Sequence, residues 1–181
     1  MPVNEEQPDL LRFPIGKFGG GEAFTPALIQ EYVQNIASLP GLLRQAVLGL
    51  NNVQLDTPYR PGGWTVRQVV HHLADSHLNS YIRFRLALTE DNPLIKPYEE
   101  QRWAELPDAQ TEPVEISLVL LEALHQRWVV LLKSLSESDW LRTFTHPVSG
   151  KTTLIKAAGL YAWHGKHHLA HITNLRQSYN Y

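Results

Sequence analysis

The chain has 181 residues, of which 43% are apolar, so its length and composition are those of one globular domain. Sixteen Lys and Arg residues against eighteen Asp and Glu leave a net charge of −2, and the basic residues are scattered, which argues against a nucleic-acid partner. The chain contains no cysteine, which excludes disulfides, thiolate metal ligands and cysteine nucleophiles. Any metal must therefore be held by nitrogen or oxygen, and a small molecule is the expected partner.

We expect a cytoplasmic protein that has no membrane partner. Residues 1–11 contain three acidic side chains and no apolar run, unlike a signal or transit peptide. Every apolar window is interrupted by His, Lys, Glu or Arg, well short of the roughly 18 consecutive apolar residues of a membrane span. Residues 1–24, rich in Pro and Gly, predict an irregular N-terminal arm on a single domain that covers residues 1–181.

Four helices are predicted, because apolar residues recur at steps of three and four along most of the chain. They are expected at residues 25–50, 65–89, 115–135 and 153–178. Thr25 and Thr65 are N-cap residues for the first two helices, and Pro40 is expected to break or kink the first. The loop at 92–113 is long enough to cover something functional. Strand signals are weak, so the expected fold is all-α, a four-helix bundle with long connecting loops.

Nine histidines stand out, and seven of them lie in two short windows. In the last helix, His164 and His168 are four residues apart on the apolar face, so both imidazoles point inward and can bind one ion. His171 lies near the edge of that face, whereas His167 is expected at the rim or in solvent. Burying two imidazoles together costs desolvation, which a divalent cation offsets. Spacing alone leaves metal binding and plain surface histidines about equally open.

A third ligand must come from another helix, and His71, His72 and His77 form the other cluster. Periodicity favours His77, because His72 lies about 100° to one side of the apolar stripe and His71 nearly opposite to it. His77 is equally open to interpretation as a core histidine with a hydrogen-bonded partner. The same interpretation is the more common one for a lone histidine such as His125, which lies on the seam of the third helix.

Long stretches of the sequence carry a family resemblance. The segment from Leu55 to His77, together with residues 160–164 and 167–172, closely resembles the YfiT group of the DinB-like superfamily, bacterial proteins described as metal-dependent hydrolases. Shorter matches at residues 13–16, 79–84, 97–99 and 124–128 extend the resemblance to nearly the whole chain. Gly165 and Lys166 replace a more histidine-rich stretch of the family, but neither falls on a ligand position.

The resemblance implies a four-helix bundle, usually a homodimer, in which three histidines hold one divalent ion per subunit. On this chain the ligands are His72, His164 and His168, so the family motif selects His72 where periodicity favours His77. Zinc is the first expectation and nickel the second, because both accept imidazole ligands. Three neutral ligands leave an open position for water, which is typical of a catalytic site.

The functional hypothesis is a metal-dependent hydrolase whose ion activates water. One alternative, drawn from relatives in the superfamily, is an S-transferase in which a low-molecular-weight thiol such as bacillithiol binds the metal as thiolate. Another is a non-catalytic metal-binding stress protein. The general base stays unassigned, because each candidate also has an ordinary structural explanation. The candidates are Asp75, Asn79, Arg83, His125 and Tyr161.

Overall fold

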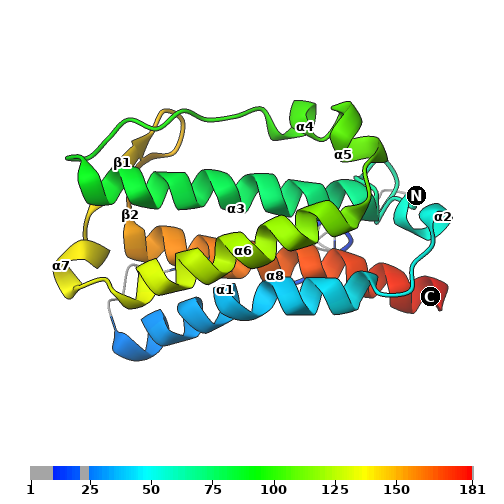
Figure 1. Ribbon diagram of the computed structural model, residues 1–181, viewed down its shortest axis with the longest axis horizontal. Helices are drawn as coiled ribbons and strands as arrows, with labels where there is room; N and C mark the ends of the chain where they lie inside the picture. Colours follow the sequence, from blue (N-terminus) through cyan, green and yellow to red (C-terminus); the bar gives the residue numbers. More distant parts are fainter. Residues whose placement is uncertain (1–9, 21–24, 181) are drawn as a thin grey trace, which may run out of the picture.

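Four long helices lie side by side in the computed structural model, which describes residues 10–20 and 25–180 (Figure 1). They are α1 (Pro26–Val47), α3 (Val66–Thr89), α6 (Val114–Lys133) and α8 (Leu154–Tyr179). The connections carry the short helices α2 (Asn52–Leu55), α4 (Glu100–Trp103), α5 (Pro107–Thr111) and α7 (Glu137–Trp140). None of the helices in these described ranges is long and apolar enough to span a bilayer. The predicted four-helix bundle is confirmed.

The helices begin at the residues that the capping signals predict. The Thr25 hydroxyl accepts a hydrogen bond from the backbone N–H of Leu28, and Thr65 forms a reciprocal capping box with Gln68. Pro40 does not break the first helix, since α1 continues through it to Val47. Of the predicted N-terminal arm, residues 10–20 are irregular, and residues 1–9 and 21–24 lie outside the described part of the chain.

The bundle has a crossed connectivity. Helix α1 packs against α6 and α8, and α3 packs against the same two helices. Figure 1 shows α1 and α8 running in one direction and α3 and α6 in the other, with the segment between α3 and α6 returning along the length of α3. Glycines allow α1 and α8 to approach closely: a Cβ atom at Gly159 would lie 2.8 Å from the Tyr32 ring, and one at Gly165 would lie 2.6 Å from Leu39. Packing thus accounts for glycine at position 165.

A small hairpin stands where the sequence analysis expects only a loop. Strands β1 (Thr143–His146) and β2 (Gly150–Thr153) pair antiparallel, and Gly150 has a φ of +80° at the turn. Four-residue strands are too short to show a recognisable alternation, which is why the pattern gives no signal. The backbone of Thr145 in β1 also bonds the segment that follows α3, at Pro93 and Ile95. The hairpin thereby fixes the start of the long connection.

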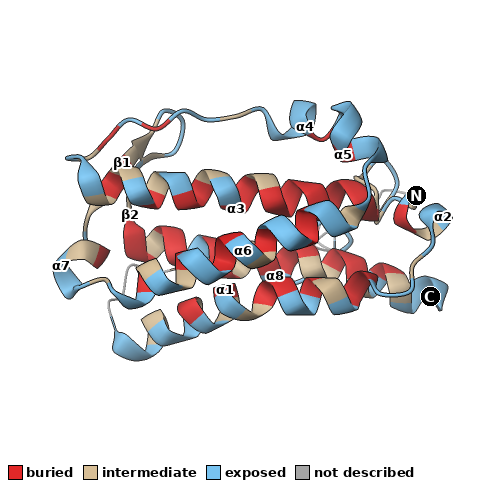
Figure 2. Cartoon of the chain, viewed as in Figure 1, coloured by how far each residue is buried: buried red, intermediate tan, exposed pale blue. Residues whose placement is uncertain are grey.

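Buried positions run along the four long helices (Figure 2), and a layer of polar side chains divides this core. One apolar cluster surrounds Trp128 and the other surrounds Leu73, and each draws residues from α1, α3, α6 and α8. Between them lie buried or half-buried histidines of α3, α6 and α8. Buried imidazoles are costly unless their nitrogens are bonded, so this layer needs specific partners.

Candidate metal centre

Three histidines from two helices converge in the polar layer. His72 of α3 and both His164 and His168 of α8 offer ring nitrogens that all lie within 4.8 Å of one another. The Nε2 atoms of His72 and His164 are 3.2 Å apart. The structure therefore brings together the three residues that the family motif selects. His77, which periodicity favours, lies five residues further along α3, and its Nε2 atom contacts Nδ1 of His164.

The donor set fits a divalent cation. Two nitrogens bound to one tetrahedral zinc at about 2.05 Å lie about 3.3 Å apart, close to the separation of the His72 and His164 Nε2 atoms. Burial lowers the pKa of His72 to about 4, and burial together with the neighbouring histidines lowers the pKa values of His164 and His168 well below the usual range. All three rings are neutral at pH 7 and present lone pairs, which suits metals that accept imidazole.

A chain of hydrogen bonds fixes the tautomer of His164. The Ile36 backbone carbonyl, which can only accept, lies 2.6 Å from His125 Nδ1, so that nitrogen carries the proton. His125 Nε2 then accepts from His77 Nδ1 at 3.0 Å, and His77 Nε2 accepts from His164 Nδ1 at 3.3 Å. The proton of His164 is therefore on Nδ1, and its Nε2 lone pair faces His72. We call this series, from His164 through His77 and His125 to Ile36, the inner relay.

The inner relay depends on a proline in another helix. In a regular α-helix the carbonyl of Ile36 would accept from the N–H of residue 40, but Pro40 has none. His125 of α6 supplies the missing donor. Pro40, an unusual residue inside an α-helix, thus leaves the Ile36 carbonyl free to accept from His125.

A second chain, the outer relay, does the same for His168. The backbone carbonyl of Arg12 accepts from His171 Nε2 at 3.2 Å. His171 Nδ1 is then the acceptor for His168 Nδ1, 3.4 Å away, which leaves the lone pair of His168 on Nε2. Such partners of ligand histidines orient the rings and raise their basicity. The N-terminal arm therefore contributes to the site through a backbone carbonyl.

The remaining histidines of the two windows have separate roles. His71 bonds the Ser117 hydroxyl at 2.7 Å and the Glu112 carbonyl at 3.1 Å, which ties α3 to the start of α6. The prediction that His167 lies at the rim is wrong, because it is buried and stacks on Trp163. Helix periodicity places that face outward, but Phe13 of the arm lies over it.

An open cavity of about 260 Å³ leads to the cluster. Its lining includes all three candidate ligands, Tyr59, Trp64 and Glu100. The Trp64 ring lies 4.5 Å from that of His72, and Tyr59 stacks on His171 at 3.9 Å. Trp64 directly precedes the N-cap of α3, so its place beside His72 follows from the capping box, but sequence reasoning gave it no role.

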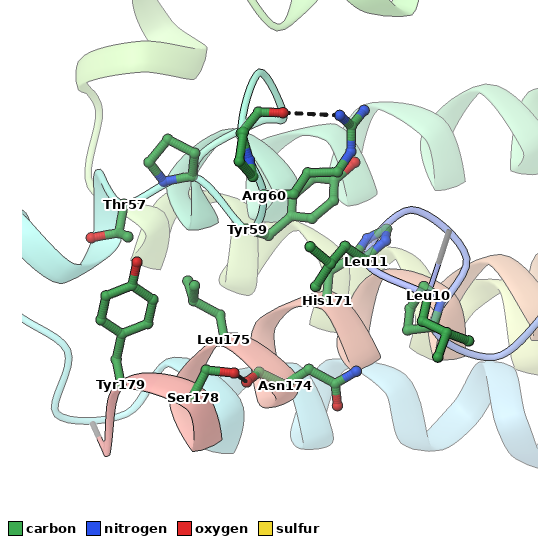
Figure 3. A pocket seen from close by; sticks show the side chains of 13 residues that line it. Leu10, Leu11, Thr57, Tyr59, Arg60, His171, Asn174, Leu175, Ser178 and Tyr179 are labelled. Carbon is green, nitrogen blue, oxygen red and sulfur yellow. Dashed lines mark hydrogen bonds between the residues drawn. The ribbon is translucent and has the colours of Figure 1, made fainter. Parts of the chain in front are cut away.

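A larger apolar cavity of about 410 Å³ adjoins the first (Figure 3). Tyr59 and Arg60 on one side and Leu175 of α8 on the other enclose it, and Leu11 of the arm lies near its edge. Tyr59, Arg60 and His171 line both cavities. The stacked pair of Tyr59 and His171 is therefore the partition between the histidine cluster and an apolar compartment.

The general-base candidates are dispersed. His125 belongs to the inner relay, and the Asn79 side chain bonds the backbone carbonyl of Asp75. Arg83 and Tyr161 line another cavity beside His164. Among the described residues that line the two cavities bordering His164, only Glu100 carries a carboxylate, and it borders both. Sequence reasoning missed Glu100, since the loop before α4 has no pattern that indicates where it folds back.

A four-helix bundle with a histidine cluster between its second and last long helices places the protein in a known class. The chain belongs to the DinB superfamily, whose family model matches residues 36–172.

Similar proteins come from Bacillus species. A protein of Bacillus mycoides named "Putative metal-dependent hydrolase" is 58% identical over 171 residues, covering 94% of this chain and 98% of its own length. A Bacillus cereus protein of the same name is 59% identical over the same coverage. The solved structure of Bacillus subtilis YfiT, described as "a probable metal-dependent hydrolase with an unusual four-helix bundle topology", is 48% identical and superposes with a TM-score of 0.93, covering 95% of this chain and 99% of YfiT.

Proposed function

We propose that this protein is a metal-dependent hydrolase whose cation is held by His72, His164 and His168. The observation that carries the proposal is the convergence of three neutral imidazoles at the wall of an open cavity. The names of its relatives support the same reaction class. A cation bound there supplies Lewis acidity, which polarises an acyl carbonyl and lowers the pKa of water. Hydrolysis adds the oxygen of one water to the acyl carbon and breaks the bond to the leaving group, which departs with a proton.

Other residues of the chain orient the ligands, limit water and transfer the proton. The two relays hold the protons of His164 and His168 on Nδ1, so each ring keeps its Nε2 lone pair for the cation. Trp64 covers one side of the cluster and limits water there. Glu100 accepts the proton that water loses and returns it to the leaving group, the ordinary role of a carboxylate in such a cavity.

The proposal extends to the identity of the metal, the size of the substrate and the oligomeric state. One ion binds per chain, with zinc first and nickel second, since imidazole ligands suit both. The substrate is a small molecule, in keeping with cavities of about 260 and 410 Å³. The family resemblance supports a homodimer, and a cytoplasmic location stays a prediction.

The test begins with metal content and proceeds to turnover. Protein purified under mild conditions is analysed for transition metals, then reconstituted with zinc or nickel and assayed against ester and amide panels. Parallel assays add bacillithiol and an electrophile. The expected result is about one equivalent of metal and thiol-independent hydrolysis, both lost in His164→Ala with helix content retained.

Three outcomes would contradict the proposal. Less than about one-tenth of an equivalent of metal after reconstitution would remove the metal centre. Thiol-dependent consumption of the electrophile without hydrolysis would establish the S-transferase. Unfolding of His164→Ala, without turnover in the wild type, would point to a structural metal.

A further inference from the structure

Another cavity, distinct from the two described above, also borders His164, and we call it the second compartment. This cavity, of about 210 Å³, is lined by Ser76, Arg83, Tyr98, Tyr161 and other residues. It shares His164 and Glu100 with the cavity that contains the histidine cluster. His164, a candidate ligand, and Glu100 therefore form part of the wall of both spaces.

Arg83 is the only Lys or Arg among the described residues that line this second compartment. It is half-buried, and within the described ranges no carboxylate pairs with it. Burial and the Arg83 charge lower the pKa of His146, which lines the same cavity. A half-buried guanidinium that lines a cavity without an ion-pair partner is suited to bind a carboxylate of a ligand through two parallel hydrogen bonds.

Three hydroxyl-bearing side chains share the second compartment with Arg83. Tyr98 and Tyr161 line the compartment, and Ser76 interacts with the Tyr98 phenol. Burial raises the pKa of Tyr98, so the phenol keeps its proton. These groups suit the polar atoms of a bound molecule.

The spacing of the two ends sets the length of the ligand. Arg83 follows His72 by eleven residues on α3, which is about 16 Å along the axis. Side chains on a helix lean toward its N-terminus, and Arg83 lines the cavity that His164 also borders. A spacer of several bonds therefore separates the group at His164 from the group at Arg83. The carboxylate of Glu100 borders both cavities, so a neutral carbonyl rather than a second anion is expected beside it.

We propose that the second compartment selects substrates with a free carboxylate, which Arg83 binds several bonds away from the carbonyl that is hydrolysed. The substrate class is the monoester or monoamide of a short aliphatic dicarboxylic acid. This inference rests on the proposed function, because the position of the reacting carbonyl is set by the histidine cluster.

Paired hydroxamates test the proposal without turnover. The monohydroxamates of succinic, adipic and suberic acid each carry a metal-binding group and a carboxylate, and alkyl hydroxamates of equal chain length lack the carboxylate. Dissociation constants are measured by calorimetry on the zinc-loaded protein. The carboxylate is expected to tighten binding at least tenfold at the best chain length.

Variants on one helix identify the residue responsible. Arg83→Gln should reduce the carboxylate advantage to less than about twofold, and Arg83→Lys should keep part of it. Arg85→Gln is the matched control, because Arg85 is exposed two residues away and bonds the Tyr81 hydroxyl instead. It should leave the advantage unchanged.

Three results would overturn the proposal, and those that concern Arg83 are distinguishable from the one that concerns the metal centre. Equal binding of the charged and uncharged partners at every length, or an advantage that survives in Arg83→Gln, would remove the role of Arg83 and leave the metal centre intact. Failure of every hydroxamate to bind the zinc-treated protein would remove the metal centre itself, and the substrate assignment with it.

Discussion

Replacing His125 by Leu breaks the inner relay at its far end. His125 lies on α6, contacts no candidate ligand, and contributes two hydrogen bonds, one from Nδ1 to the Ile36 carbonyl and one to Nε2 from His77. Leucine removes both. The Ile36 carbonyl then has no donor, since Pro40 cannot replace it, and the Nδ1 proton of His77 has no acceptor.

The structure gives a magnitude for both consequences. Each buried group left unpaired costs about 1–3 kcal/mol, so the free energy of unfolding should fall by about 2–6 kcal/mol. His77 is then free to hold its proton on either ring nitrogen, and with the proton on Nε2 it no longer accepts from His164. Loss of such a partner typically weakens metal binding by roughly 10- to 100-fold.

The assay compares zinc affinity by chelator competition in the folded variants at pH 7.5, with stability measured separately by urea. His71→Leu is the control. His71 lies on α3 and, like His125, is a buried histidine with two hydrogen bonds, but its removal leaves the inner relay intact. This variant should lose stability and keep wild-type affinity. Wild-type affinity in His125→Leu, or an equal loss in both variants, would refute the role of the relay. Nitrogen NMR of the metal-free protein gives a direct check, since His164 should carry its proton on Nδ1.

Three further predictions concern other parts of the protein. Glu100→Gln should lower kcat by roughly 10²- to 10⁴-fold with unchanged metal content. Its neighbour Glu99 lines neither cavity that borders His164, so Glu99→Gln should have little effect, and steady-state kinetics test the contrast. Burial and the nearby Asp108 charge raise the pKa of Asp75 to about 6, so the folded state holds this proton more tightly than the unfolded chain; its contribution is complete below about pH 4 and is lost as pH rises through 6. Asp75→Asn should therefore raise the urea midpoint at pH 8 and change it little at pH 4. Gly165→Ala should destabilise the protein, because overpacking against the buried leucine of α1 costs about 1–3 kcal/mol and exceeds the gain in helix propensity of about 1 kcal/mol. Gly41→Ala, with open space around it, should instead stabilise the fold, and thermal melts of both variants test the contrast.

The capping signals and the apolar periodicity predicted the long helices well, because both are local properties of the sequence. Thr25 and Thr65 cap the helices that follow them, as expected. The hairpin at 143–153 escaped prediction, since its strands depend on pairing with each other and with the segment after α3. The continuity of α1 through Pro40 depends on a donor from α6, which no pattern within α1 reveals.

The candidate site was predictable in part. The four-residue spacing of His164 and His168 placed both on one face, and the structure brings them together. Angles measured along an ideal helix favoured His77 over His72, but both histidines are buried. Which of the two joins His164 and His168 depends on the neighbouring helices, and such angles do not describe those helices. The same angles put His167 outside, since they contain no information about the arm that covers it.

The proline in α1 has a consequence for anyone who would transplant this centre into another helical bundle. Copying the three ligands together with His77 and His125 would leave the direction of the hydrogen bonds in the metal-free inner relay undetermined, because every imidazole can reverse its donor and acceptor ends. The backbone acceptor at Ile36 breaks that symmetry, and it is free only because residue 40 has no amide hydrogen. A recipient scaffold therefore needs a helix that supplies no metal ligand and in which one backbone carbonyl lacks its usual N–H donor.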